Sequence, residues 1–291
     1  MNELDIIRFI QGIRNSFLDT LMELLTELGD QLVFIAIALV IYWFFNKRIA
    51  FKLVFVFISS AIVNELLKGI IARNRPYVED PSLGVGTLTH GYSFPSGHAQ
   101  NTGVITTVLY KNYSNKSKWL KWVLLAAIII VPFTRMYLGQ HYLTDVLAGL
   151  ALGIVIALGV SVLVDMMGDK EHLFGLLITI PLVLIVFIIS SFGQTYEELK
   201  NLFVAVGGLT GFFVGYAVDK LYIQYNDLPK GIKVLYRALV GALIVGAFYL
   251  GLSFLFDMIA VDNLYLDFVR YLFVGFGGSA ISMFVFKMLK V

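Results

Sequence analysis

Residues 119–165 read WLKWVLLAAIIIVPFTRMYLGQHYLTDVLAGLALGIVIALGVSVLVD. Two apolar runs, 119–138 and 142–165, flank a short polar segment. Each run has about the 20 residues that a helix needs to cross ~30 Å of hydrocarbon. The stretch therefore predicts two membrane-spanning helices, joined by a tight connection that brings an arginine, a histidine and an aspartate close together.

The whole chain shows the same bias toward apolar residues. Of its 291 residues, 58% are hydrophobic and only 14% are charged, whereas a soluble domain averages roughly 45–50% apolar and about 25% charged. Too few charges remain to coat a surface that faces water. The formal net charge is only +2, which implies no nucleic-acid partner. The chain has no cysteine, which excludes disulfides and thiolate metal sites.

Further apolar runs extend this pattern along the chain. We predict an all-α, polytopic transmembrane helix bundle with about nine spans. The predicted spans cover roughly 29–46, 51–72, 98–112, 119–138, 142–165, 173–193, 201–220, 233–256 and 267–287. Residues 3–28 mix apolar and charged side chains, which predicts an amphipathic helix lying in the membrane interface, with a tenth span as the alternative.

These elements divide the chain into three predicted parts: an interfacial helix at 1–28, a five-span core at 29–166 and a four-span region at 167–291. The last part contains a weak repeat, because KNLFV and RYLFV, 70 residues apart at positions 200 and 270, each precede a glycine pair. The repeat predicts two hairpins of like orientation. Glycines that recur every four residues allow close helix packing in lipid, namely Gly149 and Gly153, and Gly207, Gly211 and Gly215.

Lysine and arginine are concentrated in alternate connections between the predicted spans. Short loops rich in these residues tend to be cytoplasmic, so the N-terminus is expected outside and the C-terminus in the cytoplasm. The residues that set this orientation are Lys47, Arg48, Lys52, Lys111, Lys116, Lys118, Lys121, Lys170, Lys220, Lys230, Lys233, Lys287 and Lys290.

Polar clusters fall at the opposite, non-cytoplasmic ends of the predicted spans. Lys68 and Arg75 are two helical turns apart, and Pro76 disfavours helix at Arg75, so two cations are expected at a helix end. Ser96 is a good N-cap for the next helix, and the free N–H groups of a helix N-terminus bind anions. Gly97 allows an anion to approach that backbone closely.

The third cluster contains Arg135, His141 and Asp145. His141 and Asp145 are neighbours at i and i+4, so Asp145 is expected to hold the imidazole with its other nitrogen facing outward. Together the clusters supply three cations, an anion-binding helix end, an oriented histidine and a second histidine, His98. Phosphoryl transfer needs such a set, because its transition state spreads charge over three equatorial oxygens.

In order and spacing, these residues resemble the three signature motifs of the type 2 phosphatidic acid phosphatase superfamily, which also includes glucose-6-phosphatases and vanadium haloperoxidases. The motif region covers 68–145. Thr134 stands where the family usually has serine, a change that keeps a hydroxyl group. Nine spans with the N-terminus outside are similar to glucose-6-phosphatase topology, whereas the spans in 167–291 exceed the six-span pattern common among bacterial members.

The resemblance implies a role for each motif residue. His141 would be the nucleophile that forms a phosphohistidine, Asp145 would orient it, and His98 would protonate the leaving oxygen and then activate water. The groups that would bind the phosphate oxygens belong to Lys68, Arg75, Ser96, Gly97 and Arg135. No metal and no cofactor are implied.

Two further charged residues lie near the first motif. Glu65 is one turn before Lys68 and is expected either to pair with Lys68 or a neighbouring arginine, or to face a wet cavity. Arg73 is expected to face solvent or lipid headgroups.

The resemblance implies a metal-independent phosphatase in a bacterial cell membrane, with 29–166 as its catalytic core. Its site would face outside and take a lipid phosphate or pyrophosphate from the outer leaflet. The substrates considered are undecaprenyl pyrophosphate, phosphatidic acid and phosphatidylglycerol phosphate. The alternatives are a sugar-phosphate phosphatase, a lipid phosphotransferase, and a transporter or scaffold with a vestigial site. The sequence leaves the oligomeric state open, a homodimer included.

Overall fold

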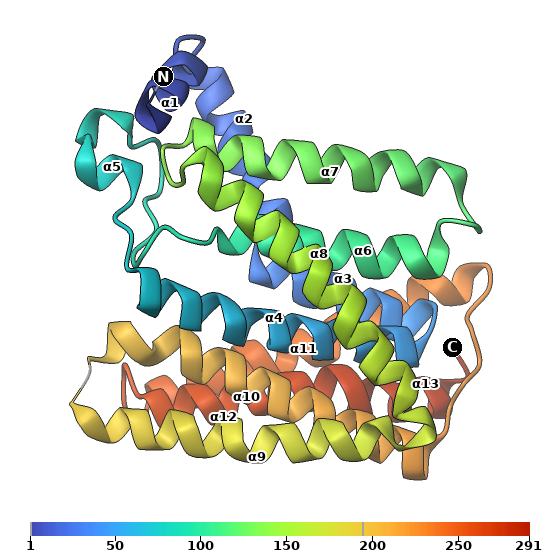
Figure 1. Ribbon diagram of the computed structural model, residues 1–291. Helices are drawn as coiled ribbons and strands as arrows, with labels where there is room; N and C mark the ends of the chain where they lie inside the picture. Colours follow the sequence, from blue (N-terminus) through green and yellow to red (C-terminus); the bar gives the residue numbers. More distant parts are fainter. Residues whose placement is uncertain (1, 194) are drawn as a thin grey trace. The chain divides into compact units, whose positions relative to one another are not determined.

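The computed structural model describes residues 2–193 and 195–291, and the regular elements in these ranges are helical (Figure 1). The α-helices are α1 (Glu3–Gln11), α2 (Ser16–Thr26), α3 (Gln31–Phe44), α4 (Lys47–Ile71), α5 (Pro76–Glu79), α6 (Gly97–Tyr113), α7 (Lys118–Tyr137), α8 (Leu143–Met166), α9 (Glu171–Ile189), α10 (Tyr196–Val218), α11 (Ile232–Asp257), α12 (Leu264–Phe276) and α13 (Ser282–Leu289). Short 3-10 or π-helical segments adjoin them: η1 (Glu27–Gly29), η2 (Pro81–Leu83), η3 (Gly168–Lys170), η4 (Ser190–Phe192), η5 (Asp219–Ile223) and η6 (Gly277–Ile281).

Seven helical segments of the described chain are long and apolar enough to cross a membrane. They are Lys47–Glu79, Lys118–Tyr137, Leu143–Met166, Gly168–Phe192, Leu199–Ile223, Ile232–Asp257 and Leu264–Leu289. The protein is therefore an all-α, polytopic helix bundle, as the sequence predicts.

The predicted count of nine spans is not confirmed. The predicted span at 29–46 is α3, which has only 14 residues and meets α2 and η1 at a bend of 50°. If this bent pair is counted as one broken span, the total becomes eight. The predicted span at 98–112 is α6, a helix of 17 residues that buries polar side chains such as Gln100 and Thr102. Such a helix suits the interior of a bundle better than contact with lipid.

The region expected as one amphipathic helix over 3–28 is divided into two helices, α1 and α2. The helix α1 ends at Gly12, and the side chain of Asn15 then accepts a hydrogen bond from the Leu18 N–H at 3.0 Å. Asparagine is a strong N-cap because its side chain satisfies a free N–H of the first turn. The chain therefore starts a new helix at Ser16.

The chain forms two compact units, and each is described by itself. Unit 1 comprises Met1–Ala38 and Lys52–Asp165. Unit 2 comprises Leu39–Phe51 and Met166–Val291.

In unit 1, glycines bring the backbones of α6 and α8 into direct contact. A Cβ atom added at Gly149 would lie 2.4 Å from the Ser96 carbonyl oxygen, and one at Gly153 would lie 2.2 Å from the Gln100 carbonyl oxygen. These distances are far below van der Waals contact, so only glycine fits at either position. The contact fixes the N-terminus of α6 beside the first turns of α8.

A buried polar contact ties α6 to α4 in the same unit. The Gln100 amide donates to the Ser60 hydroxyl at 2.7 Å and accepts from the Asn64 amide at 2.7 Å. Because these side chains are buried, each hydrogen bond holds its helix in register.

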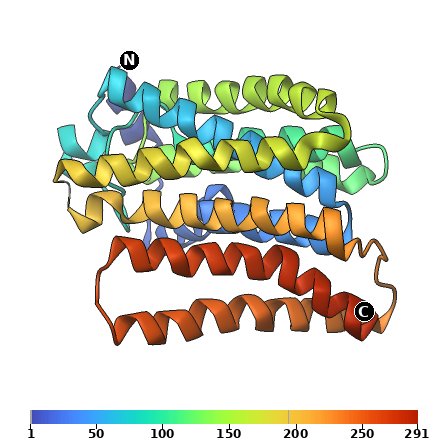
Figure 2. The ribbon, with the colours of Figure 1, turned by 90° about the horizontal axis from the view of Figure 1, so that it is seen from below.

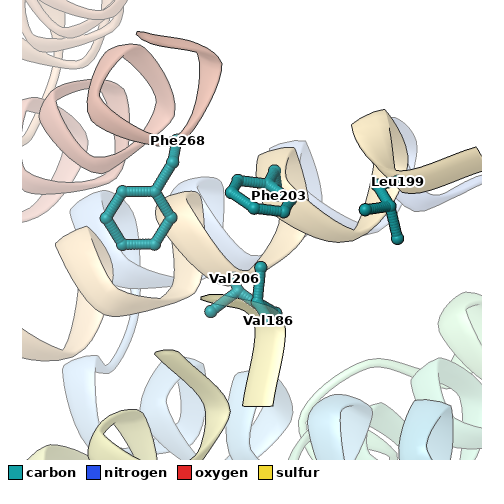
Figure 3. Packing of buried hydrophobic residues seen from close by; sticks show 5 residues of the cluster. All are labelled: Val186, Leu199, Phe203, Val206 and Phe268. Carbon is teal, nitrogen blue, oxygen red and sulfur yellow. The ribbon is translucent and has the colours of Figure 1, made fainter. Parts of the chain in front are cut away.

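In unit 2, the helices lie side by side (Figures 1 and 2). Glycines of α10 face α12: a Cβ at Gly207 would lie 2.4 Å from the Phe268 carbonyl oxygen, and one at Gly211 would lie 1.9 Å from that of Leu272. Both contact positions advance by four residues in the same direction, so α10 and α12 run parallel. A buried cluster around Phe203 supports this contact, formed by Val186, Leu199, Phe203, Val206 and Phe268 (Figure 3).

Candidate active site

Four helix ends of unit 1 carry the polar clusters. Lys68 lies in the last turn of α4, and Arg135 lies in the last turn of α7. Gly97 is the first residue of α6, and Asp145 lies in the first turn of α8. His141 lies between α7 and α8. The predicted site residues therefore come from segments that are far apart in the sequence.

His141 is buried, with 2% of its surface exposed, and both of its ring nitrogens have neighbours. Nε2 lies 3.2 Å from Arg75 Nη1, and Nδ1 lies 3.3 Å from the Ser93 hydroxyl. Since a guanidinium can only donate, Nε2 is the acceptor and the proton resides on Nδ1. The Nε2 lone pair therefore points toward a cation.

The surroundings of His141 favour its neutral form. Burial, together with the positive charges of Arg135, Arg75 and Lys68, holds the pKa of His141 well below its usual range. The imidazole is therefore uncharged near pH 7, and the three predicted cations all lie within electrostatic range of it.

Asp145 reaches His141 through a hydroxyl group rather than directly. Its Oδ2 lies 3.7 Å from His141 Nδ1, beyond hydrogen-bond distance. The Ser93 hydroxyl donates to this oxygen and faces His141 Nδ1. Tyr142 N–H also donates to Oδ2, at 2.9 Å. The sequence predicts the pairing of His141 and Asp145 but not Ser93, which lies in an irregular segment without periodicity.

Arg75 organises the loops around the histidine. Its Nε donates to the Gly91 carbonyl at 2.8 Å, its Nη2 to the His90 carbonyl at 3.0 Å, and its Nη1 to the Gln140 carbonyl at 3.1 Å. The side chain is only 4% exposed. Arg75 thus links the segment before α6 to the segment that carries His141.

Arg135 and Lys68 complete the set of cations. Arg135 donates to Thr26 Oγ1 at 3.1 Å and to Thr89 Oγ1 at 3.4 Å, while its buried Nε has no partner within the described residues. A guanidinium donor without a partner is suited to an anion oxygen. Lys68 Nζ lies 3.0 Å from Glu65 Oε1, so the expected pairing of these two residues is present.

The start of α6 contributes its backbone and a second histidine. Ser96 is the N-cap, as predicted, and its buried hydroxyl accepts from the Ala99 N–H at 3.5 Å. A Cβ at Gly97 would meet only Asn64 Oδ1, at 3.8 Å, so the space beside this backbone is open. His98 is half-buried and within electrostatic range of the cations, namely Lys68, Arg75 and Arg135, and of His141.

Arg73 lies against the site, which corrects the expectation that it faces solvent or headgroups. Its Nη1 donates to Asp145 Oδ1 at 2.8 Å and to Thr144 Oγ1 at 2.7 Å. Its guanidinium stacks 3.7 Å from the centre of the Tyr142 ring. The backbone leaves α4 through Ala72, whose φ of 49° is left-handed, and this turn directs the following residue. No periodic pattern reveals such a turn.

The site is lined by positively charged side chains. In the described ranges, no group of three or more histidine, cysteine, aspartate or glutamate side chains is placed to hold a metal ion. Positive charge here comes from Lys68, Arg75 and Arg135, with Arg73 paired to Asp145 beside them, which suits a negatively charged ligand.

Comparisons with known proteins agree with this chemistry. Residues 49–168 match the PAP2 superfamily, and residues 203–291 match the transmembrane extension of PAP2 superfamily phosphatases. An undecaprenyl-diphosphatase from Sulfolobus acidocaldarius is 30% identical over 154 residues, covering 51% of this chain and 72% of that protein. Phosphatidylglycerophosphatase B from Bacillus subtilis is 32% identical over 157 residues, covering 50% and 74% respectively.

A longer match extends into the second half of the chain. Sphingosine-1-phosphate phosphatase 1 from Rattus norvegicus is 26% identical over 249 residues, covering 76% of this chain and 56% of that protein. The two family matches and the coverage of the relatives above lead to one conclusion: this chain is a membrane-spanning phosphatase that belongs to the PAP2 superfamily, the family indicated by its motifs.

Proposed function

We propose that this phosphatase hydrolyses a lipid phosphate or lipid pyrophosphate, without a metal ion, through a phosphohistidine on His141. The relatives described above are named for undecaprenyl diphosphate, phosphatidylglycerophosphate and sphingosine 1-phosphate, which all join a phosphate or diphosphate to a lipid. The observation that carries the proposal is the buried His141, whose Nε2 accepts from Arg75 Nη1 at 3.2 Å and whose pKa is lowered by burial and by the charges of Arg135, Arg75 and Lys68.

In the first step, His141 Nε2 attacks the phosphorus atom and the bond to the lipid oxygen breaks. Lys68, Arg75 and Arg135 neutralise the charge that spreads over the equatorial oxygens. Burial and these cations lower the pKa of His98; the bound phosphate offsets the cations, so His98 takes up a proton from solvent on binding and donates it to the leaving oxygen. The His141 imidazole becomes positively charged, and the Ser93 hydroxyl and the Asp145 carboxylate stabilise the proton on Nδ1.

In the second step, His98 takes a proton from water as that water attacks the phosphorus. The phosphorus–nitrogen bond breaks, inorganic phosphate leaves, and His141 returns to its neutral form. The protein cations replace the charge that a metal ion supplies in other phosphoryl-transfer enzymes, so the chemistry needs none.

We also propose that the site opens on the non-cytoplasmic side, with the N-terminus outside and the C-terminus in the cytoplasm. The lysines and arginines of the connecting segments support this orientation, because loops rich in them stay in the cytoplasm. A headgroup could then enter from the outer leaflet. Labelling of single cysteines introduced at exposed Tyr92 and at Lys116 tests it: in intact cells, an impermeant reagent should reach the first position only.

Phosphate release by the purified full-length protein tests the reaction. The substrates are undecaprenyl pyrophosphate, phosphatidylglycerol phosphate, phosphatidic acid and glucose 6-phosphate, each with and without EDTA. We expect turnover of a lipid substrate that EDTA leaves intact, inhibition by vanadate, and no turnover by His141→Ala. Radiolabelled substrate should leave an acid-labile, base-stable label on the wild type.

Three results would count against the proposal. They are a strict requirement for Mg²⁺, full activity of His141→Ala, and turnover of glucose 6-phosphate in preference to every lipid. Transfer of the phosphate to an added lipid alcohol instead of water would identify a phosphotransferase.

A further inference from the structure

The carboxylate of Asp145 is fully buried, and its two oxygens face different groups. Oδ2 accepts from the Ser93 hydroxyl on the side of His141. Oδ1 accepts from Arg73 Nη1 at 2.8 Å. An uncompensated carboxylate at such a position would be costly, because burial removes its hydration. Arg73 supplies that compensation and leaves Oδ2 available for the histidine side.

Arg73 is held in turn by the first residue of α1. Its Nη2 lies 2.5 Å from Glu3 Oε2. Glu3 Oε1 accepts from the Thr144 N–H at 2.9 Å and from the Thr144 hydroxyl at 2.8 Å. Burial alone would raise the pKa of Glu3, but the hydrogen bonds from Thr144 and Arg73 outweigh it and hold that pKa below its usual range.

The guanidinium of Arg73 is therefore fixed on three sides: by Asp145 and Thr144 on Nη1, by Glu3 on Nη2, and by the Tyr142 ring on its face. Because the guanidinium is planar and rigid, Arg73 fixes the positions of its partners more closely than the flexible ammonium group of a lysine could.

The helix that carries Glu3 is anchored in unit 1. Ile7 is fully buried in a cluster with Leu83 and Tyr142. The Gln11 amide donates to the carbonyls of Leu83 and Tyr137, each at 2.8 Å. The helix α1 is thus packed against the segments that flank His141, and its first turn reaches Arg73.

We propose that Arg73 and Glu3 are positioning residues for the phosphatase reaction, and that α1 acts on the catalytic histidine through the chain Glu3–Arg73–Asp145–Ser93–His141. The proposal rests on the function proposed above for His141 and Asp145. Neither Arg73 nor Glu3 touches the reacting atoms in it. Arg73 fixes the place of the carboxylate and offsets part of its negative charge at the imidazole.

This arrangement predicts that substitutions of Arg73 and Glu3 lower kcat but leave KM nearly unchanged. A positioning error near the nucleophile can cost about 10²-fold in rate, so Arg73→Gln should lower kcat by about that factor and leave KM little changed. Glu3→Gln keeps an acceptor for Thr144 and removes only the charge beside Arg73, so its loss of kcat should be smaller. Arg73→Lys restores the charge without the fork and should recover part of the activity.

The pH profile separates this role from a merely structural one. The charged or titratable groups that face His141 are Lys68, Arg75, Arg135, His98 and Asp145. Removing the cation that offsets Asp145 strengthens the negative potential at the imidazole. The acid limb of kcat/KM should therefore move to higher pH in Arg73→Gln and stay near the wild-type position in Arg73→Lys.

The experiment measures kcat, KM and the pH profile of the full-length variants on the lipid phosphate that the wild type hydrolyses best, alongside the unfolding temperature. Arg8→Gln is the matched control, because it breaks an exposed ion pair of α1 with Asp80. It should keep wild-type kinetics. The inference fails if Arg73→Gln retains wild-type kcat and acid limb, or if Glu3→Gln and Arg8→Gln are indistinguishable. It fails equally if kcat falls only in proportion to the folded fraction. An active His141→Ala would instead remove the proposed function itself.

Discussion

Both units of the chain bury carboxylates, and Asp145 of unit 1 differs from Asp219 and Glu171 of unit 2 in how its two oxygens are hydrogen-bonded. In unit 1, each oxygen of Asp145 has a partner, with Arg73 on Oδ1 and Ser93 on Oδ2. In unit 2, Asp219 Oδ2 accepts from the Tyr42 hydroxyl and lies beside Lys47 Nζ, both at 2.6 Å. Its Oδ1 has no partner among the residues that the structure describes.

Glu171 repeats the arrangement of Asp219. Its Oε1 accepts from the Tyr216 hydroxyl at 2.8 Å and from Lys220 Nζ at 2.6 Å, while its buried Oε2 lacks a partner in the described chain. Both carboxylates line a cavity of about 560 Å³. A fully satisfied carboxylate is held in one geometry, which suits a group that must orient a nucleophile. Asp219 and Glu171 each leave one oxygen without a partner in the described chain, so we expect their loss to affect stability rather than turnover.

The largest expected difference is between Asp145→Asn and Asp219→Asn. An amide at position 145 cannot stabilise the imidazolium of a phosphohistidine, and it disturbs the His141 tautomer that carries the proton on Nδ1. The kcat value should therefore fall roughly 10³-fold or more. Asp219→Asn should leave kcat little changed and lower the unfolding temperature. Steady-state rates and thermal unfolding of both variants check this. A comparable loss of kcat in both would end the distinction between the units.

The next largest effect is expected at the contact between α6 and α8. Gly149→Ala forces a methyl group against the Ser96 carbonyl, and overpacking of this kind costs about 1–3 kcal/mol. Because Ser96 caps the helix end beside the site, kcat should fall as well. Gly159→Ala is the control on the same helix, since a Cβ there meets nothing within 4 Å. Equal unfolding temperatures for the two variants would contradict the prediction.

Gly211→Ala applies the same test in unit 2, because a Cβ at Gly211 would meet the Leu272 carbonyl oxygen. Gly251→Ala is its control, because a Cβ at Gly251 meets nothing within 4 Å. Gly211→Ala should lower the unfolding temperature while the folded fraction keeps wild-type kcat. A catalytic defect in the folded fraction would show that the two units are coupled.

A smaller effect is expected from two hydroxyl groups that donate to buried carboxylates. Ser93→Ala removes the group between Asp145 and His141, and a hydrogen bond to a charged group is worth about 1.5–3 kcal/mol. The kcat value should therefore fall roughly tenfold or more, and Ser93→Thr should recover part of it. Tyr42→Phe removes the corresponding donor to Asp219 and should change stability only. Normal turnover by Ser93→Ala would show that Asp145 acts without it.

The smallest expected effect concerns pH. In the proposed mechanism the attacking imidazole is neutral, and the pKa of His141 lies well below its usual range, so the acid limb of kcat/KM should lie below pH 6.5. As the pH falls from about 6.5 toward the folded-state pKa, the unfolded chain binds a proton that the folded chain does not, so stability should fall. Rates measured between pH 4 and 8 check the first statement. An acid limb above pH 6.5 would contradict it.

The sequence predicts the helices of the bundle because a long apolar run is typical of a membrane-spanning helix. The predicted number of nine spans is not confirmed, because α3 stops after 14 residues and α6 has 17 residues and buries polar side chains such as Gln100. Amphipathic character over 3–28 is visible in the sequence, but the break at Gly12 depends on the local cap at Asn15.

The candidate site divides in the same way. The residues on helix ends, such as Lys68 and Arg135, are predicted from spacing because a helix fixes where its residues point. Ser93 and Arg73 lie in irregular segments, whose paths are set by contacts such as those of Arg75 with three backbone carbonyls. No local pattern encodes such contacts, so these two residues emerge only from the three-dimensional structure.

The glycine contact between α6 and α8 has a consequence for which parts of the chain can vary around the site. The main chain of Ser96 donates its N–H to the Asp145 carbonyl at 3.0 Å, and its carbonyl faces Gly149. Backbone atoms therefore set the distance between the N-terminus of α6 and Asp145. Side chains elsewhere can vary without altering this distance, because a backbone hydrogen bond and a glycine contact fix it.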